Sequence, residues 1–255
     1  MLNSIKQFLD TVRTLVGREL RVRYKGSFFG ILWAVLSPLG TVAVLQFVFT
    51  KIIALDVPDF AAFIYSGVLP WVWFSTSIQT GATALTDNRD LVRTPFFMRP
   101  LLPVVITCTN FLLYLFALPV LLALLLFEGL PLTGALVTLP AIWLVLGILT
   151  LAVTVLIAAI GILVRDVQHL LGVVLTFWFY LTPIFYDVAD IPRDVARWFS
   201  FNPLVPVVEA HRNVTLHGRW PNWTDLALWT VIGLIVLAIS LAIFRALEDV
   251  FIEEA

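Results

Sequence analysis

The sequence predicts an all-α membrane protein with six transmembrane helices, an N-terminal amphipathic interface helix and outer re-entrant half-helices. The main observation is a set of six long stretches without Asp, Glu, Lys, Arg or His. Each reaches or approaches the ~20 residues that cross a ~30 Å hydrocarbon core, where an ionised side chain costs roughly 2.5–3.5 kcal/mol. The second is composition, because 13% charged residues in a 255-residue chain are too few for a soluble surface. The stretches lie between Lys25 and Lys51, Asp59 and Asp87, Arg99 and Glu128, Glu128 and Arg165, His169 and Asp187, and Asp225 and Arg245.

Residues 1–25 form the predicted interface helix. Apolar side chains recur at helical spacing on one face, and charged side chains occupy the other. This pattern is typical of a helix that lies in the headgroup plane with its cations toward anionic lipid. Arg23 would return to the apolar face, so we expect the helix to end or turn near Arg21 and the chain to bend at Gly26. The apolar positions are Leu2, Ile5, Phe8, Leu9, Val12, Leu15, Val16 and Leu20.

Residues 26–255 form one predicted six-span domain. We expect Pro38 to kink the first span, and Gly, Pro and Thr residues blur the start of the fourth. The expected spans are about Phe28–Thr50, Phe60–Leu85 and Leu101–Phe127, a fourth from between Thr133 and Ala141 to Val164, then Leu170–Tyr186 and Leu226–Phe244.

The segment 86–103 is predicted to be an ordered cytoplasmic connection. It mixes alternating charges with apolar residues, which makes it too polar to span the membrane. Thr86 or Asp87 is a candidate cap for a short helix that Pro95 would stop. The connection Arg165–His169, between the fourth and fifth spans, is only a few residues long.

The outer segment 187–223 contains a second apolar piece, Trp198–Val208. This piece is too short to span the membrane and is broken by Pro203 and Pro206. We therefore expect a pair of re-entrant or interfacial half-helices. Non-helical backbone at membrane depth is tolerated where protein or a water-filled path surrounds it.

The distribution of cations predicts the orientation of the chain. The formal net charge is −1, but with the N-terminus inside, eleven of the 16 Lys and Arg residues fall in cytoplasmic segments. The positive-inside rule then places both termini in the cytoplasm. Cys108 is the single cysteine and lies in a predicted span, so an internal disulfide is excluded.

Catalysis finds little support in the sequence. The three histidines are scattered over different loops, and neither an HExxH motif nor a GxxxxGK[ST] phosphate loop is present. We expect a non-catalytic chain without a metal or cofactor of its own, so any ATP would be bound by another chain. The lack of ionisable groups within the spans also argues against a proton- or sodium-coupled carrier.

Aromatic residues near the span ends have two readings. Either they form the aromatic belt at the lipid interface, or they form a wall that stacks on sugar rings or along which an apolar chain slides. On one face of the fifth span, positions 178, 182, 185 and 186 follow i, i+4, i+7, i+8 spacing. The candidate path residues are Trp33, Trp71, Trp73, Phe177, Trp178, Tyr180, Phe185 and Tyr186.

Several motifs, taken together and in order, closely resemble the ABC-2 permeases that export bacterial polysaccharides, among them O-antigen, capsule and teichoic-acid exporters. The resemblance covers nearly the whole chain. The motifs are residues 18–33 with Ser37-Pro38, residues 88–96 with Pro100-Leu101, Arg165-Asp166, residues 181–186, Ile191-Pro192 and Asn202-Pro203.

The resemblance implies a homodimeric transmembrane subunit that works with two copies of a separate nucleotide-binding ATPase, which holds ATP and Mg. The substrate would be a lipid-linked, O-antigen-like polysaccharide that crosses the bacterial inner membrane; membrane lipid surrounds the chain and nucleic acid plays no part. It implies that the segment 86–103 serves in coupling or gating. The residues implied in ATPase coupling are Arg18, Glu19, Arg21, Arg23, Lys25, Asp87, Arg89, Asp90, Arg93, Arg165, Asp166 and His169. The resemblance also implies an outer gate that contains Pro183, Pro192, Asn202 and Pro203.

Other functions stay open at this point. A teichoic-acid or capsule exporter permease is the nearest alternative, followed by an ABC-2 exporter of drugs or lipids. A membrane-embedded enzyme for lipid-linked sugars is the alternative from another class. It would need an acid/base pair at the membrane face, for which Asp87 and Asp90 are the only carboxylates remotely suited.

Overall fold

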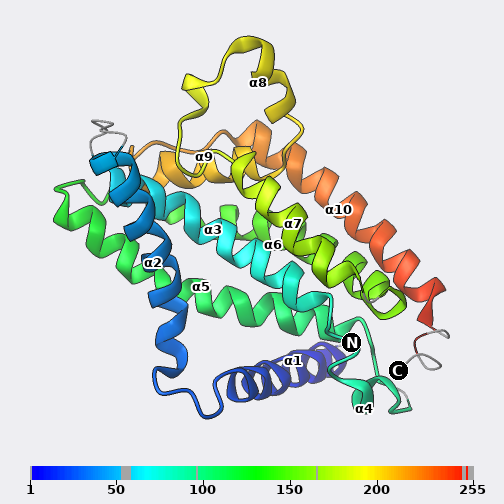
Figure 1. Ribbon diagram of the computed structural model, residues 1–255. Helices are drawn as coiled ribbons and strands as arrows, with labels where there is room; N and C mark the ends of the chain where they lie inside the picture. Colours follow the sequence, from blue (N-terminus) through cyan, green and yellow to red (C-terminus); the bar gives the residue numbers. More distant parts are fainter. Residues whose placement is uncertain (1, 53–58, 96, 165, 249–250, 252–255) are drawn as a thin grey trace.

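The structure is a computed structural model that describes residues 2–52, 59–95, 97–164, 166–248 and 251. Throughout these residues the regular elements are helices, which confirms the all-α fold (Figure 1). The α-helices are α1 Leu2–Arg23, α2 Trp33–Phe47, α3 Phe60–Gly81, α4 Arg89–Val92, α5 Leu101–Phe127, α6 Leu139–Leu163, α7 Val167–Tyr180, α8 Arg193–Phe199, α9 Leu204–Thr215 and α10 Trp223–Ala246. Short 3₁₀ or π turns cover Gly30–Leu32, Val48–Ile52, Gly134–Thr138 and Val188–Asp190.

Five helical stretches of the described residues are long and apolar enough to cross a membrane. The third of them has the bounds that the sequence predicts, Leu101–Phe127, and the second ends at Gly81, four residues before the predicted Leu85. The five stretches are Gly30–Ile52, Phe60–Gly81, Leu101–Phe127, Gly134–Leu163 and Trp223–Ala246.

The predicted fifth span is shorter than the sequence suggests. Helix α7 begins at Val167 and ends at Tyr180, six residues before the predicted end at Tyr186. Its 14 residues rise roughly 21 Å, which is less than the thickness of a hydrocarbon core. Pro183 explains the early end, because proline disfavours helical backbone in the preceding residue and lacks an N–H group. Positions 178, 182, 185 and 186 therefore do not share a helical face, and that prediction is wrong.

Helix α3 is the centre of the bundle. Of its most apolar stretch 78% is buried inside the protein, against 11% for the stretch that contains α2. Helices α2, α5, α6 and α9 all pack against α3, and α10 lies along α6 (Figure 1). Tyr65, Phe74 and Ile78 of α3 are fully buried at these contacts. Because α3 lies at the centre, a ligand can contact it only on the face that the other helices leave accessible.

Helices α3 and α6 approach closely through glycine residues. A Cβ atom at Gly161 of α6 would lie 2.2 Å from the backbone oxygen of Ala82, and one at Gly81 would lie 2.5 Å from the Thr154 side chain. Small residues at such positions let the backbones of membrane helices pack against each other.

Replacing Gly161 with Ala is expected to destabilise the bundle, because the added methyl group meets backbone rather than a movable side chain. We expect a loss of about 1–3 kcal/mol, the usual cost of overpacking. The measurement is thermal unfolding of the purified protein, with Gly40→Ala as the control, since a Cβ at Gly40 of α2 meets nothing within 4 Å. Equal melting temperatures of the two variants would contradict the prediction.

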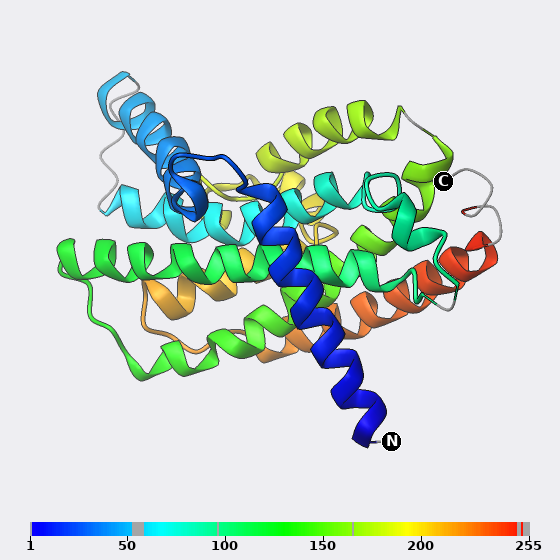
Figure 2. The same ribbon diagram turned by 90° about the horizontal axis from the view of Figure 1, so that it is seen from below.

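Helix α1 differs from its predicted setting in two respects. It crosses α5, and the apolar side chains of its C-terminal half pack there, so that this part of the apolar face is covered by protein, whereas Phe8 and Leu9 stay exposed (Figure 2). Val16 is buried there in a cluster with Leu101 and Val105. The helix also continues to Arg23 instead of ending near Arg21. The cation is accommodated on that face because the Arg23 guanidinium donates to Asn110 Oδ1 at 2.7 Å and pairs with Glu19 at 3.2 Å.

The connecting segments contain short helices where the sequence predicts them, with different ends. The N-cap of α4 is Asn88 rather than Thr86 or Asp87, and its side chain makes no capping bond. In the outer segment α8 ends at Phe199 and α9 starts after Pro203, which confirms a break there. The predicted second break at Pro206 is wrong, because Pro206 lies in the first turn of α9, where its missing N–H is tolerated.

Candidate functional site

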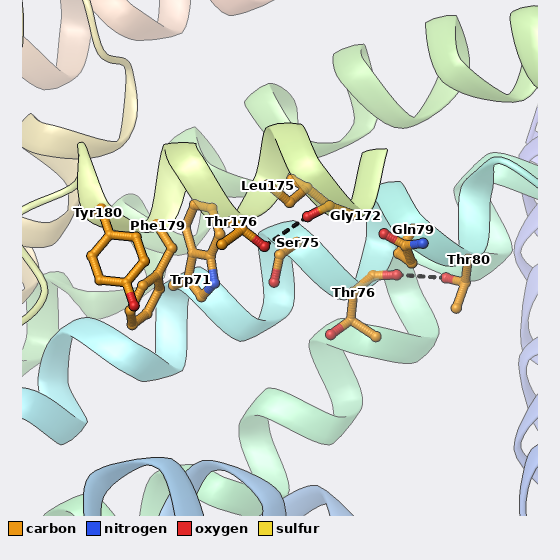
Figure 3. A pocket seen from close by; sticks show the side chains of 10 residues that line it. All are labelled: Trp71, Ser75, Thr76, Gln79, Thr80, Gly172, Leu175, Thr176, Phe179 and Tyr180. Atoms are coloured by element: carbon orange, nitrogen blue, oxygen red, sulfur yellow. Dashed lines mark hydrogen bonds between the residues drawn. The ribbon is translucent and has the colours of Figure 1, made fainter. Parts of the chain in front are cut away.

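A groove of about 440 Å³ lies between α3 and α7. Figure 3 shows its side chains, which come from these two helices alone. Aromatic rings line one end of the groove, and hydroxyl groups and an amide line the remainder. The lining residues are Trp71, Ser75, Thr76, Gln79 and Thr80 of α3, and Gly172, Leu175, Thr176, Phe179 and Tyr180 of α7.

The hydrogen bonds within the groove leave several of its hydroxyl and amide groups able to bind a ligand. The hydroxyl of Thr80 donates to the backbone oxygen of Thr76 at 2.7 Å, and that of Thr176 donates to Gly172 at 2.7 Å (Figure 3). Gln79 is exposed and donates to the backbone oxygen of Gln168 at 3.4 Å, which is a long bond. An exposed amide of this kind is unfavourable against lipid tails, so this face suits water or a polar ligand.

Two of the groove residues, Trp71 and Tyr180, are among the predicted path aromatics. The polar residues of the groove were not predicted from the sequence, although their spacing indicates them. Ser75, Thr76, Gln79 and Thr80 follow i, i+1, i+4, i+5 spacing, which places them on one face of α3. Polar side chains on one face of an otherwise apolar span would have identified the groove.

The other aromatics of the predicted path have different surroundings. Trp73 is buried, donates to the backbone oxygen of Thr107 at 3.1 Å and packs on Phe111 with ring centres 4.7 Å apart. Trp33 is half exposed beside a separate cavity of about 210 Å³ that Trp73 also lines. Neither residue lines the groove between α3 and α7.

Phe177 and Trp178 face a different hollow, which lies between α7 and α8. Phe177 is 67% exposed, whereas Trp178 is half-buried against Phe74, with ring centres 5.1 Å apart. Phe185 packs on Phe179, and the hydroxyl of Tyr186 donates to the backbone oxygen of Tyr180 at 3.0 Å. These two residues therefore stabilise the chain that follows α7.

The side chain of Asn202 ties the end of α7 to the start of α9. Its amide oxygen accepts from Trp178 Nε1 at 2.9 Å and from the backbone N–H of Leu204 at 3.0 Å. Its amide nitrogen donates to the backbone oxygen of Leu181 at 2.9 Å and to Thr182 Oγ1 at 3.1 Å. These four bonds use the two donors and two lone pairs of an asparagine amide.

Arg212 of α9 also holds the segment Leu181–Tyr186, which follows α7. The residue is only 4% exposed, and its guanidinium donates to the backbone oxygens of Ile184 at 2.6 Å and Tyr186 at 3.2 Å. It also lies 3.7 Å from the ring centre of Phe63 in α3. Burial lowers the pKa of Arg212 to about 10, and Asp187 and Glu209 oppose the shift, so the group is charged at neutral pH.

Three backbone carbonyls of the segment Leu181–Tyr186, which follows α7, thus accept hydrogen bonds from the side chains of Asn202 and Arg212. This is what non-helical backbone near membrane depth requires. Of the predicted gate residues, Pro183 is buried in this segment, Asn202 and Pro203 lie at the break before α9, and Pro192 is exposed before α8. Arg212 was not predicted as a functional residue from the sequence, although an arginine in a segment with an apolar face indicates one.

Most of the predicted coupling residues are exposed, on α1, in and beside α4, and at the start of α7. A cavity of about 330 Å³ between α1 and the segment after α3 brings Arg18, Glu19 and Arg23 close to Asp87. Glu19 and Arg23 are half-buried there, and Arg165 lies outside the described residues. The exposed members are Arg18, Arg21, Lys25, Asp87, Arg89, Asp90, Arg93, Asp166 and His169.

The fold and the groove define a multi-pass membrane protein in which α3 and α7 border an open groove with aromatic rings at one end and hydroxyl and amide groups beyond them. The described residues hold no cluster of His, Cys, Asp or Glu that could bind a metal. The chain belongs to the membrane family described as ABC-2 type transporter, whose sequence model matches residues 10–216. The expected family is thereby confirmed.

Relatives cover almost the whole chain. The O-antigen export system permease protein RfbA of Myxococcus xanthus is 33% identical over 255 residues, which are 99% of this chain and 98% of that protein. The RfbA protein of Klebsiella pneumoniae is 26% identical over 98% of this chain and 96% of its own length. The polysialic acid transport protein KpsM of Escherichia coli is 28% identical over 94% of both chains.

Proposed function

We propose that the chain is the transmembrane subunit of an ABC exporter that moves a lipid-linked, O-antigen-like polysaccharide across the bacterial inner membrane. The observation that carries the proposal is the groove between α3 and α7, together with whole-length similarity to O-antigen export permeases. Hydroxyl and amide groups suit the hydroxyls of a glycan, and aromatic rings offer sugar faces a contact that does not fix one position. A polymer that must keep moving requires this combination.

The proposal includes an assembly and an orientation. Two copies of the chain pair with two copies of a separate ATPase, which binds ATP and Mg, and both termini face the cytoplasm. Helix α7 and the segment Leu181–Tyr186 serve as the sixth crossing, and α8 and α9 are the outer half-helices that gate the exit. The charged residues of α1, α4 and the start of α7 dock on the ATPase. Their exposure supports this role.

A capsule exporter is the second candidate, supported by the similarity to KpsM. Both candidates use the same groove, and they differ in the glycan that is carried. Export of purified lipid-linked O-antigen and capsule glycans into vesicles that contain the chain and its ATPase separates them.

The groove is tested by blocking it. In a Cys108→Ser background, Thr176→Cys and Thr76→Cys each place one thiol in the groove. If the groove holds water and substrate, both thiols should react with a bulky maleimide, and export per folded protein should fall about tenfold, the loss of roughly 1.4 kcal/mol in transition-state stabilisation.

The matched control is His217→Cys, which places an exposed thiol in the outer segment, away from the lining of the groove. It should react with the maleimide without loss of export. Full export after quantitative labelling at position 176 would remove the groove from the transport path.

A further inference from the structure

Glu248 and Phe251, which follow α10, lie beside the segment that contains α4. After the helix, the backbone N–H of Leu247 bonds to Ile243 at 3.1 Å, and that of Phe251 bonds to Leu247 at 3.2 Å. The end of α10 and the segment after α3 lie on the same side of the molecule (Figure 2). A buried cluster contains residues from both, which confirms their contact.

Arg99 forms the polar part of this contact. Its Nη1 atom pairs with Glu248 Oε1 at 2.6 Å, while its Nε atom donates to the backbone oxygen of Val92 at 2.9 Å. The Arg99 side chain is 13% exposed, so the ion pair is partly shielded from solvent. One guanidinium thus joins the last residue of α4 to the C-terminal segment through two charge-assisted hydrogen bonds.

Phe251 forms the apolar part. It is fully buried, and its ring lies 4.9 Å from that of Phe244 in an edge-to-face arrangement. Both rings belong to the cluster that contains Val92, the buried residue of α4. The same cluster includes Leu85, which lies between α3 and α4.

Helix α4 depends on these contacts for its position. It has only four residues, its N-cap makes no side-chain bond, and a helix this short is unstable by itself in water. Val92 and the backbone contact to Arg99 are what fix it against the bundle.

We propose that Glu248 and Phe251 are positioning residues that hold α4 in the orientation in which it meets the partner ATPase. Because α10 lies along α6 and α6 packs on α3, the C-terminal segment also gives α4 a second connection to the helices that form the groove. The ATPase part of this inference rests on the proposed function, whereas the positioning of α4 does not.

Hydrogen exchange tests the positioning directly. The amides of Leu91, Val92 and Arg93 bond to Asn88 and Arg89. In Phe251→Ala they should exchange about tenfold faster than in the natural chain, because the local opening becomes easier. Phe251→Leu, which keeps an apolar side chain, should retain most of the protection, and a chain that stops after Phe251 should retain all of it. Unchanged exchange in Phe251→Ala would overturn the inference.

The second measurement is the number of ATP molecules hydrolysed per polymer exported, in vesicles that contain the chain and its ABC ATPase. Glu248→Gln and Phe251→Ala should leave assembly intact and raise this ratio several-fold. A normal ratio in a variant whose α4 amides exchange faster would overturn the coupling role. If the natural chain itself exports no glycan, the proposed function fails, and the exchange experiment still decides whether the C-terminal segment positions α4.

Discussion

Replacing Arg212 with Leu is expected to abolish export and to lower the amount of folded protein sharply. The backbone oxygens of Ile184 and Tyr186 would lose their donors, and each buried unpaired group costs about 1–3 kcal/mol. The segment Leu181–Tyr186 would no longer be held between α9 and α3, because the guanidinium also packs on Phe63. The measurements are thermal unfolding and export per folded protein.

Arg212→Lys gives a graded test of the same contact. An ammonium group is a point charge that lacks the planar fork, so it cannot hold both carbonyls while stacking on a ring. We expect intermediate stability and reduced export. Arg219→Leu is the control, since Arg219 lies in the same outer segment and is exposed. Normal unfolding and export in Arg212→Leu would show that the buried cation is dispensable.

Asn202→Asp should have the second largest effect, although the two side chains have nearly the same shape. The carboxylate would face the backbone oxygen of Leu181 and could not donate to it or to Thr182. We expect a loss of about 1–3 kcal/mol in stability, because a half-buried carboxylate then faces the Leu181 and Thr182 oxygens, and a corresponding loss of export. Asn213→Asp, at a half-buried position of α9, is the matched control and should be tolerated.

Trp178→Phe separates the contributions of the ring and of the indole N–H. Phenylalanine keeps an aromatic ring near Phe74 and loses only the bond to Asn202. We expect it to be milder than Asn202→Asp, at about 1 kcal/mol of stability, with export per folded protein unchanged. A strong loss of export without a loss of stability would instead assign Trp178 to the glycan path.

Much of the architecture could be predicted from the sequence. An ionised side chain is costly in lipid, so the gaps between charged residues predict the spans, and the bounds of Leu101–Phe127 are confirmed. The amphipathic pattern of residues 1–25 predicts α1, because helical periodicity is local. The break at Pro203 is likewise a local consequence of proline chemistry.

The positions that differ from prediction depend on contacts between residues far apart in the chain. Arg23 stays within α1 because Asn110, 87 residues away, accepts its hydrogen bond. Pro183 ends α7 locally, but the segment Leu181–Tyr186 keeps its path because Asn202 and Arg212, from elsewhere in the chain, supply donors for its carbonyls. The groove exists only because α7 lies beside the polar face of α3. Sequence periodicity predicts which residues share a face of one helix. Which other helix packs against that face depends on burial and hydrogen bonding in the whole bundle, so only the tertiary structure determines it.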